Sequence, residues 1–446
     1  MPDNASVPSD GDVVPVPVTT LDLADPTPVP VNGEGAGLVL VRLHGVPLGV
    51  VHPRDVTSMD AEQAVRWATD HLAGPVAEHL ALDGLGPEEL EAGLALPAAD
   101  CAAAAATVGR PVSVVICTLG QDERLVRTVR SVLDQTYRPL EVVVVDNQPA
   151  TGAVRAMLAG VADERLRVVS EPCRGLSAAR NAGVRAATGG VVAFTDDDAH
   201  ADREWIARLV APYRHPGVVA TTGLVLPAEL ATRAQLLFEE FGAFDKGLRR
   251  TVWAMGNRDL AAIGPRGDGG ALFPYSAGVY GSGNNMSFDR RWLVGSGQFD
   301  EALGAGSLTR GGEDLDAFCT VLLTGGVLVY EPAAIVWHSA RRDLDALRSQ
   351  LRGYGSGLSA MLTKQLIGGP RAALGIARRV PAGLVRLLAP GSEKNAGRSA
   401  GYPAELSRVE LRGVLAGPVL YVRGRREARR RRAAAPLAAA DAPSAR

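Results

Sequence analysis

Three adjacent aspartates, Asp196, Asp197 and Asp198, directly follow the apolar run Val191–Thr195. Neighbouring carboxylates repel one another, so a divalent cation or a cationic ligand best explains their place at the end of a predicted strand. Alternate side chains of an extended chain point the same way, so Asp196 and Asp198 can face one ligand while Asp197 turns away. The pattern indicates a Mg²⁺ or Mn²⁺ site that holds a nucleotide diphosphate; the alternative is an acidic cap on the next helix.

Two other apolar runs also end at polar residues: Thr118 follows Val112–Cys117, and Asp146 follows Leu140–Val145. Strand and helix patterns alternate through this part of the chain, with further strands at 166–169 and 218–222 and helices at 124–135, 176–187 and 204–213. Such alternation predicts an α/β domain with a mostly parallel sheet, whose ligands gather at the carboxyl ends of the strands.

Further candidate ligand-binding residues lie in two glycine-containing segments. Arg174 and Arg180 precede the acidic strand, and either guanidinium could reach a diphosphate; the alternative for Arg180 is an exposed charge on a helix. In the second segment, Gly283 permits close backbone approach, and the amides of Asn284 and Asn285 suit a hydroxyl-rich acceptor. A plain glycine-rich turn is the competing interpretation of that segment.

The last acidic motif is Gly311–Asp316, which contains Glu313 and Asp314. Taken in order, these motifs resemble the family 2 glycosyltransferases over about residues 111–340. The resemblance implies a GT-A fold, in which the acid after the second strand contacts the nucleobase or ribose, an Asp-x-Asp element holds the metal and diphosphate, and a later Glu-Asp supplies the base. By position, these roles fall to Asp146, to Asp196 with Asp198, and to Asp314 beside Glu313.

The same resemblance adds Asn181 to the donor-binding candidates, which also include Thr118 and Asp197, and makes His338 a third metal ligand. Neutral imidazole suits Mn²⁺, although a structural role for a single histidine is the alternative. Many family members carry a second acid where this chain has Asn147, so the donor nucleotide is not specified.

A base and a metal site suffice for a single displacement at an anomeric carbon. We therefore expect an inverting, metal-dependent transferase that moves a sugar from a nucleotide diphosphate to the hydroxyl of a glycan or lipid-linked acceptor in cell-envelope glycan or glycoconjugate synthesis. One rival is a nucleotidyltransferase, but Thr118–Glu123 is acidic where that class has a basic glycine-rich loop. The other is an inactive sugar-binding scaffold, which the intact acidic motifs argue against.

Around this domain we expect four flanking regions. They are a disordered or extended lead at 1–35, a small acidic α+β module with the Ala-rich linker Ala102–Ala106 at 36–106, a basic helical region at 341–432, and a disordered tail at 433–446, which leave 107–340 for the GT-A-like domain. The four cysteines are scattered without the close pairing typical of a zinc site, which indicates reduced, structural thiols.

The two ends of the chain differ in charge, although the formal net charge is only −2. Residues 1–105 hold 16 Asp/Glu and 3 Lys/Arg, whereas residues 339–446 hold 7 Asp/Glu and 21 Lys/Arg. With no signal sequence or apolar run long enough to span a membrane, we expect a cytoplasmic protein. The arginines mixed with Leu, Ile and Val in Leu366–Ala389, and the seven arginines at 423–432, predict peripheral binding to an anionic membrane surface.

Plainer interpretations of the basic region are that its helices pack on the catalytic domain, or that its arginines are solvated or pair with the acidic module. Nucleic acid is not expected as a partner because aromatic residues that could stack on bases are sparse in this region.

Overall fold

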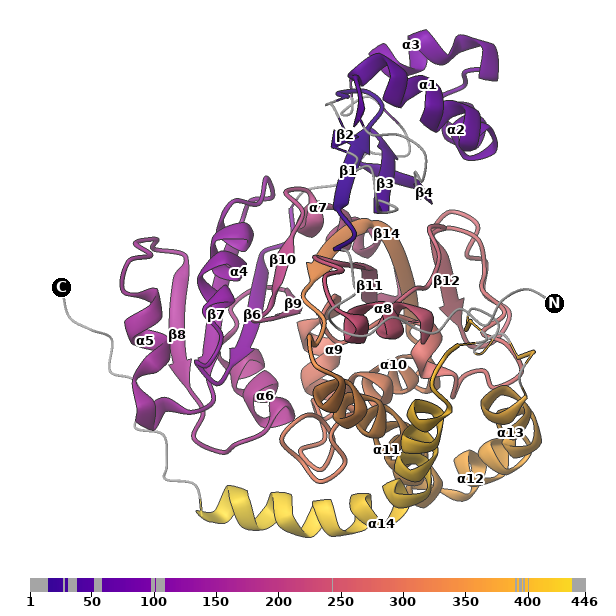
Figure 1. Ribbon diagram of the computed structural model, residues 1–446. Coiled ribbons are helices and arrows are strands. Elements are labelled where there is room, and N and C mark those ends of the chain that lie inside the picture. Colours follow the sequence, from indigo (N-terminus) through magenta and orange to yellow (C-terminus); the bar gives the residue numbers. More distant parts are fainter. Residues whose placement is uncertain are drawn as a thin grey trace.

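The computed structural model describes residues 15–26, 29–30, 38–51, 58–97, 101, 109–242, 244–389, 391–392, 395, 398–399 and 401–434. The linker Ala102–Ala106 and the tail beyond residue 434 lie outside the described residues. Figure 1 shows a small N-terminal module standing on a larger α/β body, with the C-terminal helices along the opposite side of that body.

The N-terminal module combines short strands with three short helices. β1 (Val18–Asp22), β3 (Leu38–Leu43) and β4 (Val46–Val51) form one sheet in the order β1-β3-β4. β2 (Val29–Pro30) pairs with β5 (Ser58–Met59), and the helices are α1 (Ala61–His71), α2 (Ala73–Leu82) and α3 (Leu90–Ala95). The expected α+β character of this region is confirmed.

Within the lead, for which we expected a disordered or extended chain, β1 is an extended strand that belongs to the module. It lies within residues 1–35, yet it pairs in parallel with β3, and its Leu21 is fully buried in the module core together with Leu23. Apolar side chains two residues apart lie on the same face of an extended chain. Even this proline-rich segment can therefore place apolar side chains in the core.

The central sheet has the order β10-β14-β11-β13-β9-β6-β7-β8, and β12 pairs with β14 outside this path. Its strands are β6 (Val112–Thr118), β7 (Leu140–Asp146), β8 (Leu166–Ser170), β9 (Val191–Asp196), β10 (Ala199–Ala201), β11 (Val218–Pro227), β12 (Thr251–Ala254), β13 (Met286–Asp289) and β14 (Val327–His338). β6 to β9 are parallel as predicted, but β13, β10 and β12 run antiparallel to their neighbours, so the sheet is mixed rather than mostly parallel.

Helices cover the faces of this sheet. They are α4 (Arg124–Leu133), α5 (Ala153–Leu158), α6 (Leu176–Ala186), α7 (Trp205–Val210), α8 (Arg233–Glu240), α9 (Arg290–Gly295) and α10 (Glu313–Leu323). In α4 the apolar residues recur at helical spacing, so Leu125, Val129 and Val132 lie on one face and are fully buried against the sheet. An α/β fold with flanking helices is thus confirmed.

The C-terminal region is helical, as expected, and packs on the α/β body (Figure 1). It comprises α11 (Leu344–Gly368), α12 (Pro370–Ala377), α13 (Val380–Leu388) and α14 (Ala404–Ala434). Glycines allow α11 and α14 to approach closely: a Cβ on Gly355 or Gly413 would overlap the backbone of the other helix. Among the described helices, none is both long enough and apolar enough to cross a membrane.

Candidate active site

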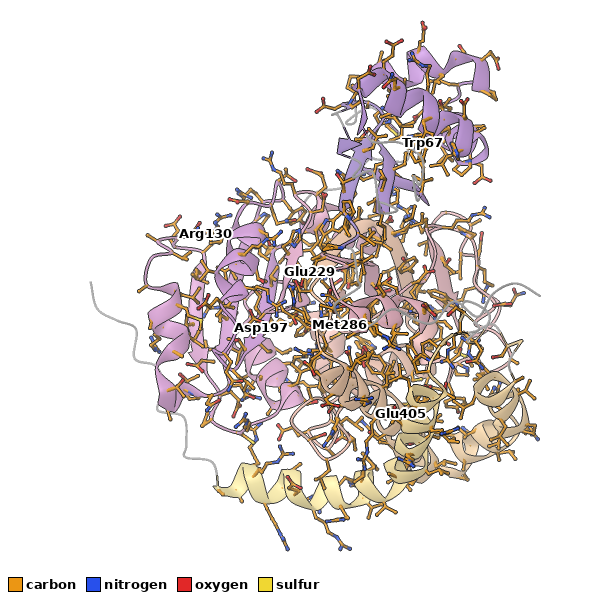
Figure 2. The ribbon with its side chains drawn as sticks, in the orientation of Figure 1. Trp67, Arg130, Asp197, Glu229, Met286 and Glu405 are labelled. Atoms are coloured by element: carbon orange, nitrogen blue, oxygen red, sulfur yellow. The ribbon has the colours of Figure 1, made fainter. Side chains whose placement is uncertain are left out.

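A cavity of about 2510 Å³ opens along the carboxyl ends of β6 and β9. Of the predicted site residues, it is lined by Thr118, Arg174, Arg180, Asp196, Asp197, Asp198, Gly283, Asn284, Glu313, Asp314 and His338. Figure 2 labels Asp197 near the middle of the molecule, between the N-terminal module and the C-terminal helices. The fold therefore gathers motifs spread over 220 residues of sequence around one space.

Strand register brings the predicted metal ligands together. The chain leaves β9 at Asp196, turns, and enters β10, whose Ala199 lies opposite His338 at the end of β14. The backbone N–H of Ser339 donates to the Asp198 carbonyl at 3.1 Å, and His338 Nε2 lies 3.3 Å from Asp198 Oδ1. Ligand atoms of Asp196, Asp198 and His338 all lie within 4.8 Å of one another.

Asp197 turns away from this cluster, as the alternation predicted. It accepts a hydrogen bond from the Thr118 hydroxyl at 2.5 Å, and this contact joins the ends of β6 and β9. Burial raises the pKa of Asp197 to about 7, with further contributions from Asp198 and Asp196, while the Thr118 bond opposes the shift. Thr118 and Asp197 therefore line the cavity next to the candidate metal ligands Asp196, Asp198 and His338.

Arg180 is buried, with 3% of its side chain exposed, so the interpretation as an exposed helix charge does not hold. Its Nη1 pairs with Glu313 Oε1 at 2.7 Å, and its Nη2 donates to the Gly283 carbonyl at 2.9 Å and lies 3.7 Å from Asp196 Oδ1. One guanidinium therefore connects three of the sequence motifs. Burial, with Asp314 nearby, raises the pKa of Glu313 to about 7, although Arg180 pulls it down.

Asp314 is the second residue of α10, which follows Gly311–Gly312, and it lies on the cavity wall. Its Oδ2 accepts the Gly283 N–H at 2.9 Å and its Oδ1 accepts the Leu315 N–H at 2.8 Å. Gly312 has a φ of +93°, which favours glycine, and a Cβ there would lie 2.4 Å from the Gly357 carbonyl of α11. The carboxylate is therefore positioned by a turn that is clamped against the C-terminal region.

Of the two asparagines in the predicted acceptor segment, only Asn284 faces the cavity. It is 2% exposed, and neither polar atom of its side chain has a hydrogen-bond partner among the described residues. Burying an amide without a hydrogen-bond partner costs free energy, and a polar ligand in the cavity would supply that partner.

The structure does not bring Asp146, Asn181 or Asn285 to the cavity surface. Asn181 exchanges two 2.9 Å hydrogen bonds with the backbone of Phe299. Asn285 accepts from Trp205 and donates to two backbone carbonyls, and buried Asp146 accepts the Gln148 N–H. These bonds hold neighbouring loops, and they occupy more of the hydrogen-bonding capacity of Asn181 and Asn285 than of Asp146; ligand contact by these three residues stays a prediction.

Part of the chain that forms this cavity is similar to known proteins. Residues 113–256 match the model of Glycosyl transferase family 2. This part of the chain is therefore similar to the family 2 glycosyltransferases. Over 135 residues it is 41% identical to the glucosyl-dolichyl phosphate glucuronosyltransferase of Haloferax volcanii, a match of 29% of this chain and 43% of that protein. It is 29% identical over 238 residues to the succinoglycan biosynthesis protein ExoO of Rhizobium meliloti, covering 50% of this chain and 59% of that protein.

The chain thus spans only about half the length of these relatives. Among solved structures, the mannosyltransferase PcManGT from Pyrobaculum calidifontis, in complex with GDP-Man and Mn²⁺, is similar at 19% identity with a TM-score of 0.44. That alignment covers 80% of this chain and 97% of the mannosyltransferase.

Around the candidate site, the structure adds residues that sequence motifs did not single out. Arg341 Nη1 lies 4.0 Å from Asp198 Oδ2, and Lys246, Tyr354 and Arg379 also line the cavity. Burial, with Arg386 nearby, lowers the pKa of Lys246 to about 8, although Asp245 opposes the shift. These side chains come from loops and C-terminal helices with no recognisable motif, and only the basic character of the region hinted at them.

Asp196, Asp198 and His338 are suited to bind a divalent cation. Asp198 is buried, and its Oδ1 has no hydrogen-bond partner among the described residues despite the nearby imidazole. Burial raises the pKa of Asp198, but His338 and Arg341 outweigh it and leave this pKa below its usual value. Two carboxylates and one imidazole are a donor set suited to Mn²⁺, and the carboxylates also suit Mg²⁺.

Proposed function

We propose that this protein is an inverting, metal-dependent glycosyltransferase that moves a sugar from a nucleotide diphosphate to the hydroxyl of a glycan or lipid-linked acceptor. The observation that carries the proposal is the buried Arg180, which joins Asp196 of the metal cluster to Glu313 and to Gly283. This guanidinium holds the end of β9, with its proposed metal ligands, and the turn before Asp314 at the same cavity. Sugar transfer by the proposed mechanism needs a metal site and a base close together.

In this proposal, Asp196, Asp198 and His338 hold Mn²⁺ or Mg²⁺. The bound ion supplies positive charge that stabilises the departing nucleotide diphosphate. Arg174 and Arg341 line the cavity, Arg341 with its Nη1 4.0 Å from Asp198 Oδ2, and both can pair with phosphate oxygens. Because a histidine belongs to the ligand set, we propose Mn²⁺ as the preferred ion.

Asp314 is proposed as the base that removes the proton of the acceptor hydroxyl. Its neighbour Glu313 is committed to Arg180, so Glu313 acts as a positioning residue. With one carboxylate as base and none assigned as nucleophile, the displacement occurs in a single step and inverts the anomeric centre. Asn284, whose buried amide lacks a partner, is proposed to bind a sugar hydroxyl.

We further propose that the acceptor is lipid-linked and that the enzyme works on the anionic inner face of the cell membrane. The name of the Haloferax volcanii relative includes a dolichyl phosphate, and that of an Escherichia coli relative a diphosphoundecaprenol. Large apolar side chains are exposed on α12, α13 and α14, namely Leu374, Val380, Leu384, Val385, Leu415, Val419 and Val422. α14 also carries the arginine run, so apolar and basic side chains occur on the same helix.

The test is a donor screen with purified full-length protein. UDP-, GDP- and TDP-sugars are incubated with Mn²⁺, and nucleotide release and thermal stabilisation are measured. We expect one nucleotide class to stabilise the protein only with metal, Asp198→Ala to abolish both effects, and the anomeric proton of the product to show inversion by NMR. Full activity in excess chelator would remove the metal from the mechanism, and retention of configuration would remove the single displacement.

A further inference from the structure

A second group of potential metal ligands lies in the N-terminal module and does not line the active-site cavity. It consists of His44, His79, Asp83 and Cys101, whose ligand atoms all lie within 4.8 Å of one another. His44, His79 and Cys101 are buried, with 3%, 4% and 0% of their surface exposed. Nothing in the proposed transfer reaction uses this cluster.

Local structure explains how the four residues meet. His44 and Gly45 form the two-residue turn between β3 and β4, with φ values of 54° and 77°. Turns of this kind favour Asn, Asp or Gly at the first position, yet this one carries histidine. The Asp22 carboxylate fixes the turn by accepting the N–H groups of His44 at 3.2 Å and of Gly45 at 2.7 Å.

His79 and Asp83 come from one helical face, because they are four residues apart at the end of α2. Cys101 completes the group from beyond α3. Within the cluster, His44 Nδ1 lies 3.2 Å from His79 Nε2, and Cys101 Sγ lies 3.3 Å from the same nitrogen. The other ring nitrogen of His44 is buried without a hydrogen-bond partner among the described residues, so the contacts of this imidazole are directed into the cluster.

These separations match those of ligands on one tetrahedral ion. With Zn–N near 2.0–2.1 Å and Zn–S near 2.3 Å, tetrahedral geometry places two nitrogens about 3.3 Å apart and a nitrogen and a sulfur about 3.6 Å apart. Hydrogen bonds alone explain the arrangement less well, because the single lone pair of His79 Nε2 cannot accept fully from both an imidazole N–H and a thiol.

We propose that His44, His79, Asp83 and Cys101 form a structural zinc site. The donor set of two imidazoles, one thiolate and one carboxylate is closed and suits tetrahedral Zn²⁺. The site joins the β3–β4 turn to α2. The same turn docks on the catalytic domain, where the buried Arg208 of α7 donates to the His44 carbonyl at 3.2 Å. Zinc would therefore order the surface by which the module contacts the transferase domain.

The experiment measures metal in the purified full-length chain. The chain is stripped with chelator, reloaded with Zn²⁺ and desalted, and bound zinc is quantified by mass spectrometry. Wild type and Asp198→Ala should each retain one equivalent, whereas Cys101→Ser and His79→Gln should lose it. The matched controls, Cys173→Ser and His71→Gln, change a buried cysteine elsewhere and an exposed histidine of the same module, and they should retain zinc.

A second measurement needs no variant. Co²⁺ added to the stripped wild-type chain should give the thiolate-to-cobalt charge-transfer band of a tetrahedral site, and Zn²⁺ should displace it. Absence of this band together with no retained zinc in wild type would overturn the proposal. Full zinc retention by both Cys101→Ser and His79→Gln would do the same. Loss of zinc in Asp198→Ala alone would place the ion in the active site instead.

Discussion

Single side chains determine the chemistry of this cavity through their hydrogen-bond commitments. Arg180 and Glu313 form a buried ion pair. Each carboxylate oxygen of Asp314, by contrast, accepts a hydrogen bond from a backbone N–H group at the cavity wall. A carboxylate held by backbone donors is well oriented yet still has lone pairs for an incoming proton. This difference supports the distinct roles proposed for the two adjacent acids.

Replacement of Asp314 by Asn should lower kcat by about 10²–10⁴-fold because the amide keeps the size of the side chain but cannot accept the proton. Donor affinity, measured by calorimetry, should barely change. Asp316→Asn is the control: this acid lies two residues along α10 and pairs with Lys364 and Gln365, so its loss should affect stability more than chemistry. Fast single-turnover transfer with lost donor binding in the Asp314 variant would make Asp314 a binding residue.

At the scale of elements, the C-terminal helix α11 supports the active-site turn directly. A Cβ on Gly357 would lie 2.6 Å from the backbone carbon of Gly311 and 2.8 Å from the nitrogen of Gly312. Two backbones can approach this closely only where neither carries a side chain. The basic region is therefore part of the structure that positions Asp314.

Gly357→Ala should accordingly reduce kcat by about 10–10²-fold, since a displacement of about 1 Å at the base is enough for such a loss. Gly368→Ala is the matched control in the same helix, because a Cβ there meets nothing within 4 Å. Steady-state kinetics and thermal melts of both variants decide the matter. Equal activity of the two would show that the turn is independent of α11.

A second element-scale prediction concerns Glu141 of β7. Its carboxylate accepts hydrogen bonds from Ser113 on β6 and from the N–H and hydroxyl of Thr188, and it pairs with Arg167 on β8. Burial opposes the charged form, but these partners outweigh it and lower the pKa of Glu141 to about 2. A lowered pKa in the folded state stabilises the fold above the unfolded value of 4.5, and this contribution disappears as pH falls toward 2.

Glu141→Gln should therefore reduce the free energy of unfolding by about 1–2 kcal/mol at pH 7. The difference from wild type should shrink as pH falls below 4.5, which denaturant unfolding at several pH values measures. Glu164→Gln, on the exposed surface, should show little effect. A difference that is independent of pH would mean that packing, and not charge, makes Glu141 stabilising.

At the scale of the whole molecule, the acidic N-terminal module and the basic helix α14 lie at opposite ends. Figure 2 labels Trp67 in the module and Glu405 near the start of α14, at opposite ends of the molecule. Within the described chain, pairing of the arginine run with the module is thus excluded. Arg432 instead contacts Glu171 and Glu301 of the catalytic domain. Five other arginines of the run remain exposed, namely Arg423, Arg425, Arg426, Arg429 and Arg430.

The protein should therefore co-sediment with anionic vesicles at low salt and less well at high salt. Reversing the charge of Arg429 and Arg430 together should weaken binding by about tenfold or more, since each basic residue contributes about 1 kcal/mol. Arg130→Glu is the control, because Figure 2 shows Arg130 on the side of the body away from α14. Failure to bind anionic vesicles at low salt would indicate an acceptor that is not presented at a membrane.

The sequence alone determined the α/β fold and the polar residues at strand ends, because both follow from local periodicity. The Asp196–Asp198 pair and the Glu313–Asp314 turn could be predicted for the same reason, with family resemblance assigning their roles. Local pattern could not show that the side-chain amides of Asn181 and Asn285 hydrogen-bond to backbone groups. The partners are distant in sequence, and only the folded chain brings them within reach. The antiparallel strands of the sheet, and the support that α11 gives to Asp314, likewise depend on contacts between distant segments. The scattered cysteines suggested no zinc site, yet folding brings His44, His79 and Cys101 together, because the chain reverses at the β3–β4 turn and returns through α2.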